Sequence, residues 1–156
     1  MKRDEEPSLT LKGFVEGTII VLDLDRFGEM VEEKGLSEYK PNVVTGLLTQ
    51  LVEEFVRKWS GVVIYGLDHK RGTEEAVIEI PYVEPSEVAD DLEKIKREVE
   101  KTGASITIVA IKDYVIARSA RDRREAYYGT PGRARALKLL KKAKRRGGGQ
   151  LVIESI

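Results

Sequence analysis

The chain contains no cysteine, a single histidine and few aromatic residues, which make up 6% of its 156 residues. The absence of cysteine excludes disulfides, zinc–thiolate centres and thiol catalysis, and one histidine excludes a multi-histidine metal site. No apolar run reaches the roughly 18 residues that a transmembrane helix needs. The residues before Pro7 are charged rather than signal-like. We therefore expect a cytoplasmic protein with no membrane association.

Charge is abundant in this chain. Charged residues account for 35% of the sequence and hydrophobic residues for 41%, a composition that indicates a globular domain with an ionic surface. The heavy Lys, Glu and Arg content favours a thermophilic source. The length is that of one ordinary domain with enough residues to bury a core. We expect residues 1–156 to form a single domain, with a flexible start at residues 1–12.

The net charge of zero hides an asymmetry along the chain. Residues 1–117 carry 15 Lys and Arg against 24 Asp and Glu, whereas residues 118–156 carry 12 against 3. The C-terminal part is therefore expected to face an anion, which is either a phosphate, a nucleic acid or the acidic part of the same protein. The charge count does not separate these alternatives.

The hydrophobic pattern predicts an α+β fold. Residues 17–25 form an apolar run typical of a central strand buried on both faces, and residues 41–59 repeat apolar pairs every fourth residue, as an amphipathic helix does. The further predicted elements are a short helix at 27–33, a hairpin of strands 61–65 and 76–80, a helix from Ser86 to Gly103, a strand at 105–117, a polar loop at 118–131, a basic helix at 132–146 and a strand at 151–153. The core order is βαββαβ, which predicts a ferredoxin-like palm domain, an antiparallel sheet with helices, extended by one helix and a C-terminal edge strand.

Two aspartates end the first strand. Asp23 and Asp25 are two residues apart, so both carboxylates project to the same face of a strand. Hard cations such as Mg²⁺ prefer oxygen ligands, commonly one or two carboxylates together with substrate phosphates. Asp25 has an alternative interpretation as the cap of the helix that begins near Phe27. The chain has no P-loop and no Rossmann glycine fingerprint.

Motifs at both ends of this pattern resemble a known superfamily. Asp23-Leu24-Asp25-Arg26-Phe27, with Gly35 twelve residues after Asp23, resembles the D-x-D-x-F opening of GGDEF diguanylate cyclase domains. The basic helix is similar to that family's last helix at Ala136, Leu140, Ala143-Lys144 and Gly147, although Leu139 replaces an alanine. Gly129-Thr130-Pro131 and Gly149-Gln150-Leu151-Val152 also resemble the end of class III nucleotidyl cyclases. The resemblance spans about residues 17–153 and implies a palm fold.

The family's middle motif has two possible registers in the predicted hairpin. Tyr65-Gly66-Leu67-Asp68 resembles Y-G-G-D and fits the spacing from the preceding helix, which makes Asp68 our preferred second carboxylate. The segment Arg71-Gly72-Thr73-Glu74-Glu75 resembles G-G-D-E and forms the better hairpin tip, which offers Glu74 or Glu75 instead. Neither register is a complete GGDEF motif.

The resemblance implies a site for Mg²⁺ or Mn²⁺ and a nucleoside triphosphate. Asp23, Asp25 and a hairpin carboxylate would hold the metal, and Lys144 corresponds to the family's triphosphate-binding lysine, with Lys141, Arg145 and Arg146 nearby. We expect a purine triphosphate-binding domain that acts as a nucleotidyl cyclase or nucleotide-hydrolysing enzyme, in a homodimer with nucleotide between the subunits. The alternatives are a catalytically inactive nucleotide or metal sensor, and a nucleic-acid-binding module that uses the basic 118–146 segment.

Base selectivity is expected to be weak. Val31 and Lys40 stand where the family's guanine-reading asparagine and aspartate would be, and a valine offers no hydrogen bond to a base edge. An apolar pocket discriminates by only about 1–3 kcal/mol, so ATP and GTP should bind within roughly a hundredfold of each other, with no synthesis of cyclic di-GMP. Calorimetric titration of both triphosphates checks this expectation. A thousandfold preference for GTP would contradict it.

Overall fold

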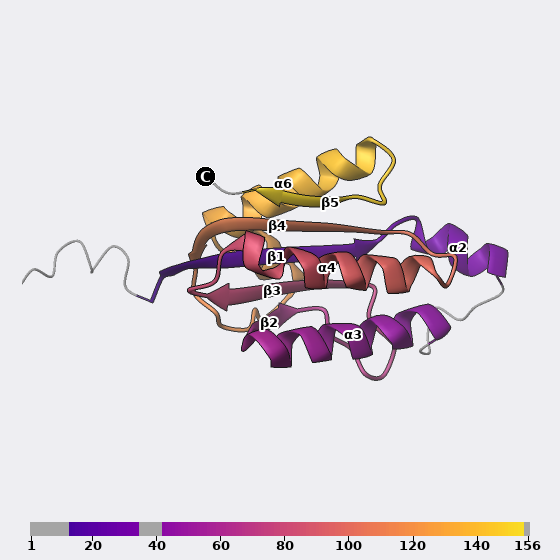
Figure 1. Ribbon diagram of the computed structural model, residues 1–156, viewed down its shortest axis with the longest axis horizontal. Helices are drawn as coiled ribbons and strands as arrows, with labels where there is room; N and C mark the ends of the chain where they lie inside the picture. Colours follow the sequence, from indigo (N-terminus) through magenta and orange to yellow (C-terminus); the bar gives the residue numbers. More distant parts are fainter. Residues whose placement is uncertain (1–12, 35–41, 155–156) are drawn as a thin grey trace, which may run out of the picture.

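The computed structural model describes residues 13–34 and 42–154, apart from the side chains of residues 30, 31, 33 and 34. Within this part of the chain the strands form one mixed sheet in the order β2-β3-β1-β4-β5 (Figure 1). The strands are β1 (Val15–Leu24), β2 (Val62–Tyr65), β3 (Glu75–Pro81), β4 (Ile106–Val115) and β5 (Leu151–Glu154). The helices are α2 (Phe27–Lys34), α3 (Val43–Trp59), α4 (Pro85–Glu100), α5 (Arg123–Tyr128) and α6 (Pro131–Arg145). No helix of the described residues is both long and apolar enough to cross a membrane.

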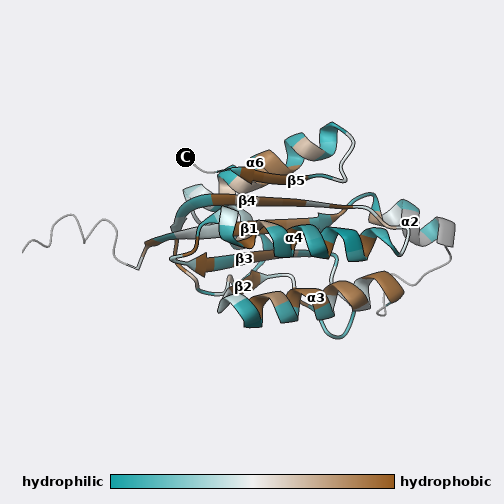
Figure 2. Ribbon diagram, viewed as in Figure 1, coloured by the Kyte–Doolittle hydropathy of each residue, from teal (hydrophilic) through white to brown (hydrophobic). Residues whose placement is uncertain are grey.

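Strand β1 lies at the centre of the sheet, as its apolar run predicts. It pairs antiparallel with β3 on one side and with β4 on the other. Ile20 and Leu22 point into a core beneath α3 and α4, while Ile19 and Val21 point into a second core beneath α5 and α6. In Figure 2, β1 and β4 are largely hydrophobic, whereas the outward side of α4 is hydrophilic, as expected for strands that are covered on both faces. The prediction that this strand is buried on both faces is confirmed.

The βαββαβ core and the palm architecture are also confirmed. The path β1-α3-β2-β3-α4-β4 gives four antiparallel-paired strands in the order that a ferredoxin-like fold requires. Strand β5 adds to the outer edge of β4 in parallel, which makes the complete sheet mixed rather than purely antiparallel. A parallel neighbour needs a crossover connection, and α5 and α6 supply it on the face opposite α3 and α4.

The segment 118–131 differs from its prediction as a loop. It contains α5, whose first turn is capped by the Asp122 carboxylate accepting the Glu125 N–H, and it leads into α6 through a second cap at Thr130. Helix α3 begins at Val43 with Asn42 as its cap, and Pro41, which was expected in its first turn, lies outside the described residues.

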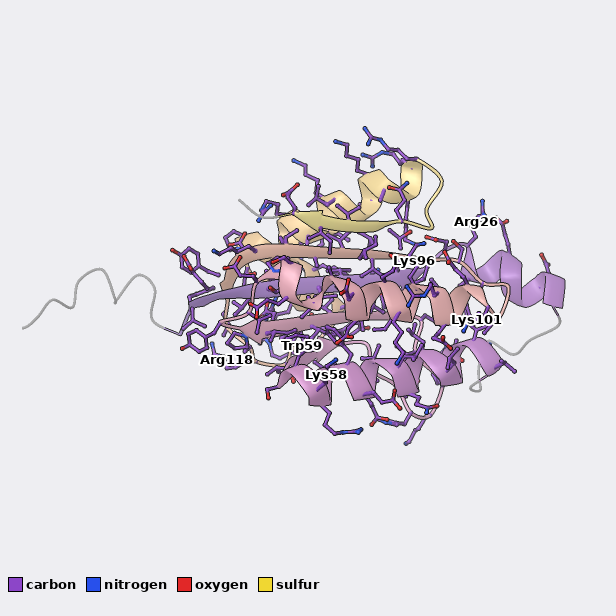
Figure 3. The ribbon with its side chains drawn as sticks, in the orientation of Figure 1. Arg26, Lys58, Trp59, Lys96, Lys101 and Arg118 are labelled. Carbon is purple, nitrogen blue, oxygen red and sulfur yellow. The ribbon has the colours of Figure 1, made fainter. Side chains whose placement is uncertain are left out.

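Side chains at the C-terminal end of α3, beyond the core residues Leu48, Val52 and Phe55, are bonded to α4. The Trp59 Nε1 donates a hydrogen bond of 2.7 Å to Asp91 Oδ2, and Lys58 Nζ lies 2.8 Å from the same oxygen (Figure 3). Trp59 is only partly buried against the core, and its indole N–H adds a polar link between the two helices.

A buried ion pair fastens α6 to the sheet. Arg133 Nε lies 2.8 Å from Glu79 Oε2, and their side chains are 4% and 0% exposed. The other carboxylate oxygen of Glu79 accepts the N–H groups of Ile116 and Ala117, while Arg133 also donates to the carbonyl of Glu125. The pair therefore connects β3, the segment after β4, α5 and the first turn of α6.

We predict that Arg133→Met destabilises the protein by about 3–5 kcal/mol, because it leaves Glu79 charged and buried without its partner. The matched control is Arg121→Met, whose side chain is 87% exposed and should change stability by less than about 1 kcal/mol. Urea unfolding of both variants measures the difference. Equal destabilisation would show that the buried pair has no special weight.

Candidate metal and phosphate site

Two carboxylates face each other where β1 ends and β3 begins. Asp23 and Glu75 are paired in the register of these strands, on the face that also carries Val21 and Val77 and is covered by α6. Side chains directly opposite each other in an antiparallel pair have Cβ atoms about 4.5–5.5 Å apart. The hairpin expected beside Asp23 is thus confirmed, and it brings a carboxylate to Asp23 through backbone pairing alone.

Lys144 reaches this point from the last turn of α6. Its Nζ lies 3.4 Å from Asp23 Oδ1 and 2.8 Å from Asp25 Oδ1. It also donates to the main-chain carbonyl of Leu24 at 3.1 Å. An ammonium group therefore occupies a position where several oxygens converge.

Asp25 is the most completely bonded carboxylate of this group. Its side chain is 5% exposed and accepts hydrogen bonds from Ser105 Oγ at 2.6 Å, Thr107 Oγ1 at 2.7 Å and the Gly149 N–H at 2.8 Å, besides Lys144. Burial alone would raise the pKa of Asp25, but the bonds from Lys144, Ser105, Thr107 and Gly149 together hold it below its usual range. Its described partners come from β4, the residue before β4, α6 and the turn before β5, which indicates an anchoring role rather than a cap of α2.

Asp23 is electrostatically different from Asp25. Burial raises the pKa of Asp23 from 3.8 to about 6, and the neighbouring negative charge of Glu75 adds to this shift, while Lys144 opposes it. Its side chain keeps 25% exposure. Asp23 is therefore a partly buried carboxylate whose ionised form would be favoured by an additional cation.

Helix α5 supplies the partners of Glu75. The Tyr127 hydroxyl donates to Glu75 Oε1 at 2.7 Å, and Arg123 Nε donates to Oε2 at 3.0 Å. Burial, and then the bond to Glu75, raise the pKa of Tyr127 well above its ordinary value, so the hydroxyl keeps its proton and donates. Sequence reasoning missed Arg123 and Tyr127 because it treated their segment as a loop. The Asp122 cap, three residues before Glu125, was the available signal.

The other hairpin carboxylates have different surroundings. Asp68 Oδ1 accepts the N–H groups of Lys70 and Arg71, both at 2.9 Å, and these bonds lower the pKa of Asp68. Glu74 is exposed, and its carbonyl accepts the Leu24 N–H. Asp68, Glu74 and Glu75 all border one polar cleft of about 400 Å³. The strand register favours Glu75 over Asp68, our preferred choice from sequence, as the partner of Asp23.

The remaining predicted cations lie apart from this carboxylate pair. Lys141 borders a separate groove beside Tyr128 and Leu137, and Arg145 and Arg146 are exposed at the end of α6. Of the four predicted phosphate-binding residues, Lys144 is the one for which the described structure shows contacts to the aspartates. The Val31 side chain and Lys40 lie outside the described residues, so their assignment stays a prediction.

The oxygen donors fit a hard cation that also binds phosphate. Among the described residues, no group of three or more acidic, histidine or cysteine side chains is placed to surround a metal. Asp23, Glu75 and the Leu24 carbonyl provide two carboxylates and one neutral oxygen, and the Lys144 ammonium shows that this cluster attracts positive charge. Mg²⁺ characteristically takes one or two carboxylates and completes its shell with water and substrate phosphates.

Comparison with known proteins gives a fold relationship. No protein-family model and no curated protein sequence matches the chain. Among solved structures, the diguanylate cyclase SiaD from Pseudomonas aeruginosa, in complex with its activator SiaC, is 16% identical with a TM-score of 0.57, and the match covers 96% of this chain but only 53% of SiaD.

Two further structures match over most of both chains. The active GGEEF domain of a Vibrio cholerae diguanylate cyclase is 18% identical with a TM-score of 0.54, covering 94% of this chain and 86% of that one. A microbial GGDEF domain studied with bis-(3′,5′)-cyclic di-GMP is 20% identical with a TM-score of 0.52, covering 94% and 81%. The chain therefore has the fold of GGDEF diguanylate cyclase domains, a nucleotidyl cyclase-like palm.

Proposed function

We propose that this domain binds a nucleoside triphosphate together with Mg²⁺ or Mn²⁺ at the end of β1. The observation that carries the proposal is the pairing of Asp23 with Glu75 across adjacent strands, with the Lys144 ammonium against Asp23. Function has to be argued from such a site, because one fold serves many activities. A partly buried carboxylate pair flanked by cations from other elements suits a ligand that brings a metal and phosphates together.

Each residue has a defined part in this proposal. Asp23 and Glu75 hold the divalent cation, and Asp25 keeps Lys144 beside them through its 2.8 Å contact. Lys144 would donate to phosphate oxygens, because its ammonium lies beside Asp23 and hydrogen bonds from a lysine to a phosphate are strengthened by charge. When bound, Mg²⁺ neutralises charge on the phosphates and polarises them.

The reaction consistent with this arrangement is attack of a ribose hydroxyl on the α-phosphorus with loss of pyrophosphate, or hydrolysis of the triphosphate. The site would stabilise the charge that develops on the phosphate oxygens, which is the main contribution expected of Lys144. A domain that binds the same ligand without turnover would be a nucleotide sensor. Product analysis after incubation with triphosphate and Mn²⁺ separates the two.

Nucleic-acid binding by the 118–146 segment is less well supported. Several of its basic side chains are engaged within the protein: Arg121 with Glu125, Arg123 with Glu75, Arg133 with Glu79, Arg135 with Asp113, and Lys144 with the two aspartates. In the described structure, five of the 12 basic residues of this segment are therefore paired with carboxylates of the same chain. A nucleic-acid interface would instead need these cations to bind phosphates rather than carboxylates of the same chain.

We predict that Lys144→Ala weakens binding of ATP and GTP, measured with Mg²⁺ by calorimetry, by about tenfold to a hundredfold, as expected for loss of a hydrogen bond to a charged group. Removal of the γ-phosphate should cost more affinity than exchange of the base. Lys141→Ala is the matched control, since Lys141 lies at a separate groove and should change affinity by less than about threefold. Similar losses in both variants would contradict the assignment of Lys144.

We predict that Asp23→Asn stabilises the metal-free protein above pH 6 while it abolishes divalent-ion binding. The pKa of Asp23 is about 6 in the folded state against 3.8 ordinarily, so the folded state binds a proton more tightly than the unfolded state. Stability contributed by this group is present below pH 4 and is lost as pH rises to 6, by up to about 3 kcal/mol. The variant lacks this slope. Denaturant unfolding between pH 4 and 8 measures it.

The control for this experiment is Asp90→Asn on the exposed side of α4, which should shift stability by less than about 0.5 kcal/mol at any of these pH values. Unchanged Mn²⁺ affinity in the Asp23→Asn variant would remove the metal site from the proposal.

A further inference from the structure

The described structure shows a second cation beside the carboxylate pair, contributed by α5. Arg123 contacts Glu75 through Nε at 3.0 Å from Oε2 and through one terminal nitrogen at 3.2 Å from Oε1. Its side chain is 58% exposed, whereas that of Glu75 is 21% exposed. The guanidinium therefore lies at the mouth of the site, on the Glu75 side, while Lys144 lies on the Asp23 side.

We infer that Arg123 is a second residue that contacts phosphate. When a divalent cation binds Glu75, the Arg123 guanidinium moves from that carboxylate to the phosphates of the ligand. This inference rests on the proposed function. It assigns the site to a chain of phosphates rather than to a single phosphate, because two cations from two helices flank the carboxylate pair. A guanidinium is suited to this exchange, since its fork of N–H donors matches a phosphate as well as a carboxylate.

Tyr127 makes the exchange feasible. It is 1% exposed, and its hydroxyl holds Glu75 Oε1 at 2.7 Å, so Glu75 keeps one fixed hydrogen bond after Arg123 departs. The Arg123 guanidinium also lies 4.8 Å from the centroid of the Tyr127 ring, a cation–π contact that supports it independently of Glu75. The buried tyrosine thus positions both groups, while the exposed arginine is the partner that can move.

The charges around the carboxylate pair predict that Arg123 affects the binding of a bare cation and of a phosphate chain in opposite directions. Lys144 Nζ lies 3.4 Å from Asp23 Oδ1 and Arg123 Nε lies 3.0 Å from Glu75 Oε2, so both cations act on the carboxylate pair. A divalent ion competes with Arg123 for Glu75 and is repelled by its charge, whereas an anion bound to that ion attracts it. Removing Arg123 should therefore strengthen binding of the bare ion and weaken binding of a phosphate chain. A purely structural arginine would not produce opposite effects.

The test uses Mn²⁺ and inorganic tripolyphosphate with the full chain. Calorimetry measures Mn²⁺ binding alone, then tripolyphosphate binding at saturating Mn²⁺, for wild type, Arg123→Ala and the neighbouring control Arg124→Ala. We expect Arg123→Ala to tighten Mn²⁺ binding by about two- to fivefold, the range of an exposed ion pair, and to weaken tripolyphosphate binding by about tenfold or more. Arg124, exposed on the same helix, should leave both constants within about twofold of wild type.

The outcomes separate this inference from the proposed function. If wild type binds Mn²⁺ and tripolyphosphate, Lys144→Ala weakens the latter, and Arg123→Ala behaves as Arg124→Ala does, the role of Arg123 is overturned and the site stands. If Arg123→Ala weakens both ligands while thermal unfolding shows a loosened α5, its role is structural and the inference fails. If wild type binds neither ligand, both the site and the inference fail.

Discussion

The buried carboxylate of Asp25 is the interaction on which the rest of the site depends. It takes hydrogen bonds from Ser105 and Thr107 of the β4 side, from the Gly149 N–H before β5 and from Lys144 of α6. A charge removed from water has to be compensated by such donors. The donors on α6 and on the turn before β5 therefore hold these two segments against the end of β1. Gly148 in that turn has no room for a Cβ, which would lie 2.7 Å from the Asp25 carboxyl carbon.

On the face of the sheet beneath α5 and α6, acidic residues of the strands are paired with basic residues of the helices. Glu75 and Glu79 of β3 meet Arg123 and Arg133, and Asp23 of β1 meets Lys144. The pair of Glu79 and Arg133 is buried and holds α6 against the sheet. The pairs nearer the strand ends retain exposure, so their cations are able to exchange a carboxylate for a ligand. Burial distinguishes a structural ion pair from one available for binding.

This arrangement also accounts for the charge asymmetry of the sequence. The basic segment that follows residue 117 supplies the helices that pack against acidic positions of β1 and β3, and its residues Arg123, Arg133 and Lys144 are paired with carboxylates there. The likeness to GGDEF domains concerns the arrangement of strands and helices, and sequence identity of 16–18% carries no residue-level role with it. The assignment of Glu75 and Arg123 to the site rests on this chain's own contacts.

The sequence by itself determined the strands, the long helices and the position of Asp23, because periodicity and apolar runs are local properties that folding preserves. The sequence also singled out Lys144, through a motif on a helix whose boundaries are set by local sequence. The tertiary structure alone decided that Glu75, rather than Asp68, stands opposite Asp23, because a shift of strand pairing by one residue reverses every side chain between faces. It also decided the role of Asp25, whose partners are separated from it by 80 to 124 residues. Helix α5 escaped prediction because six residues are too few to show a helical period, and packing against β2 and α6 stabilises it.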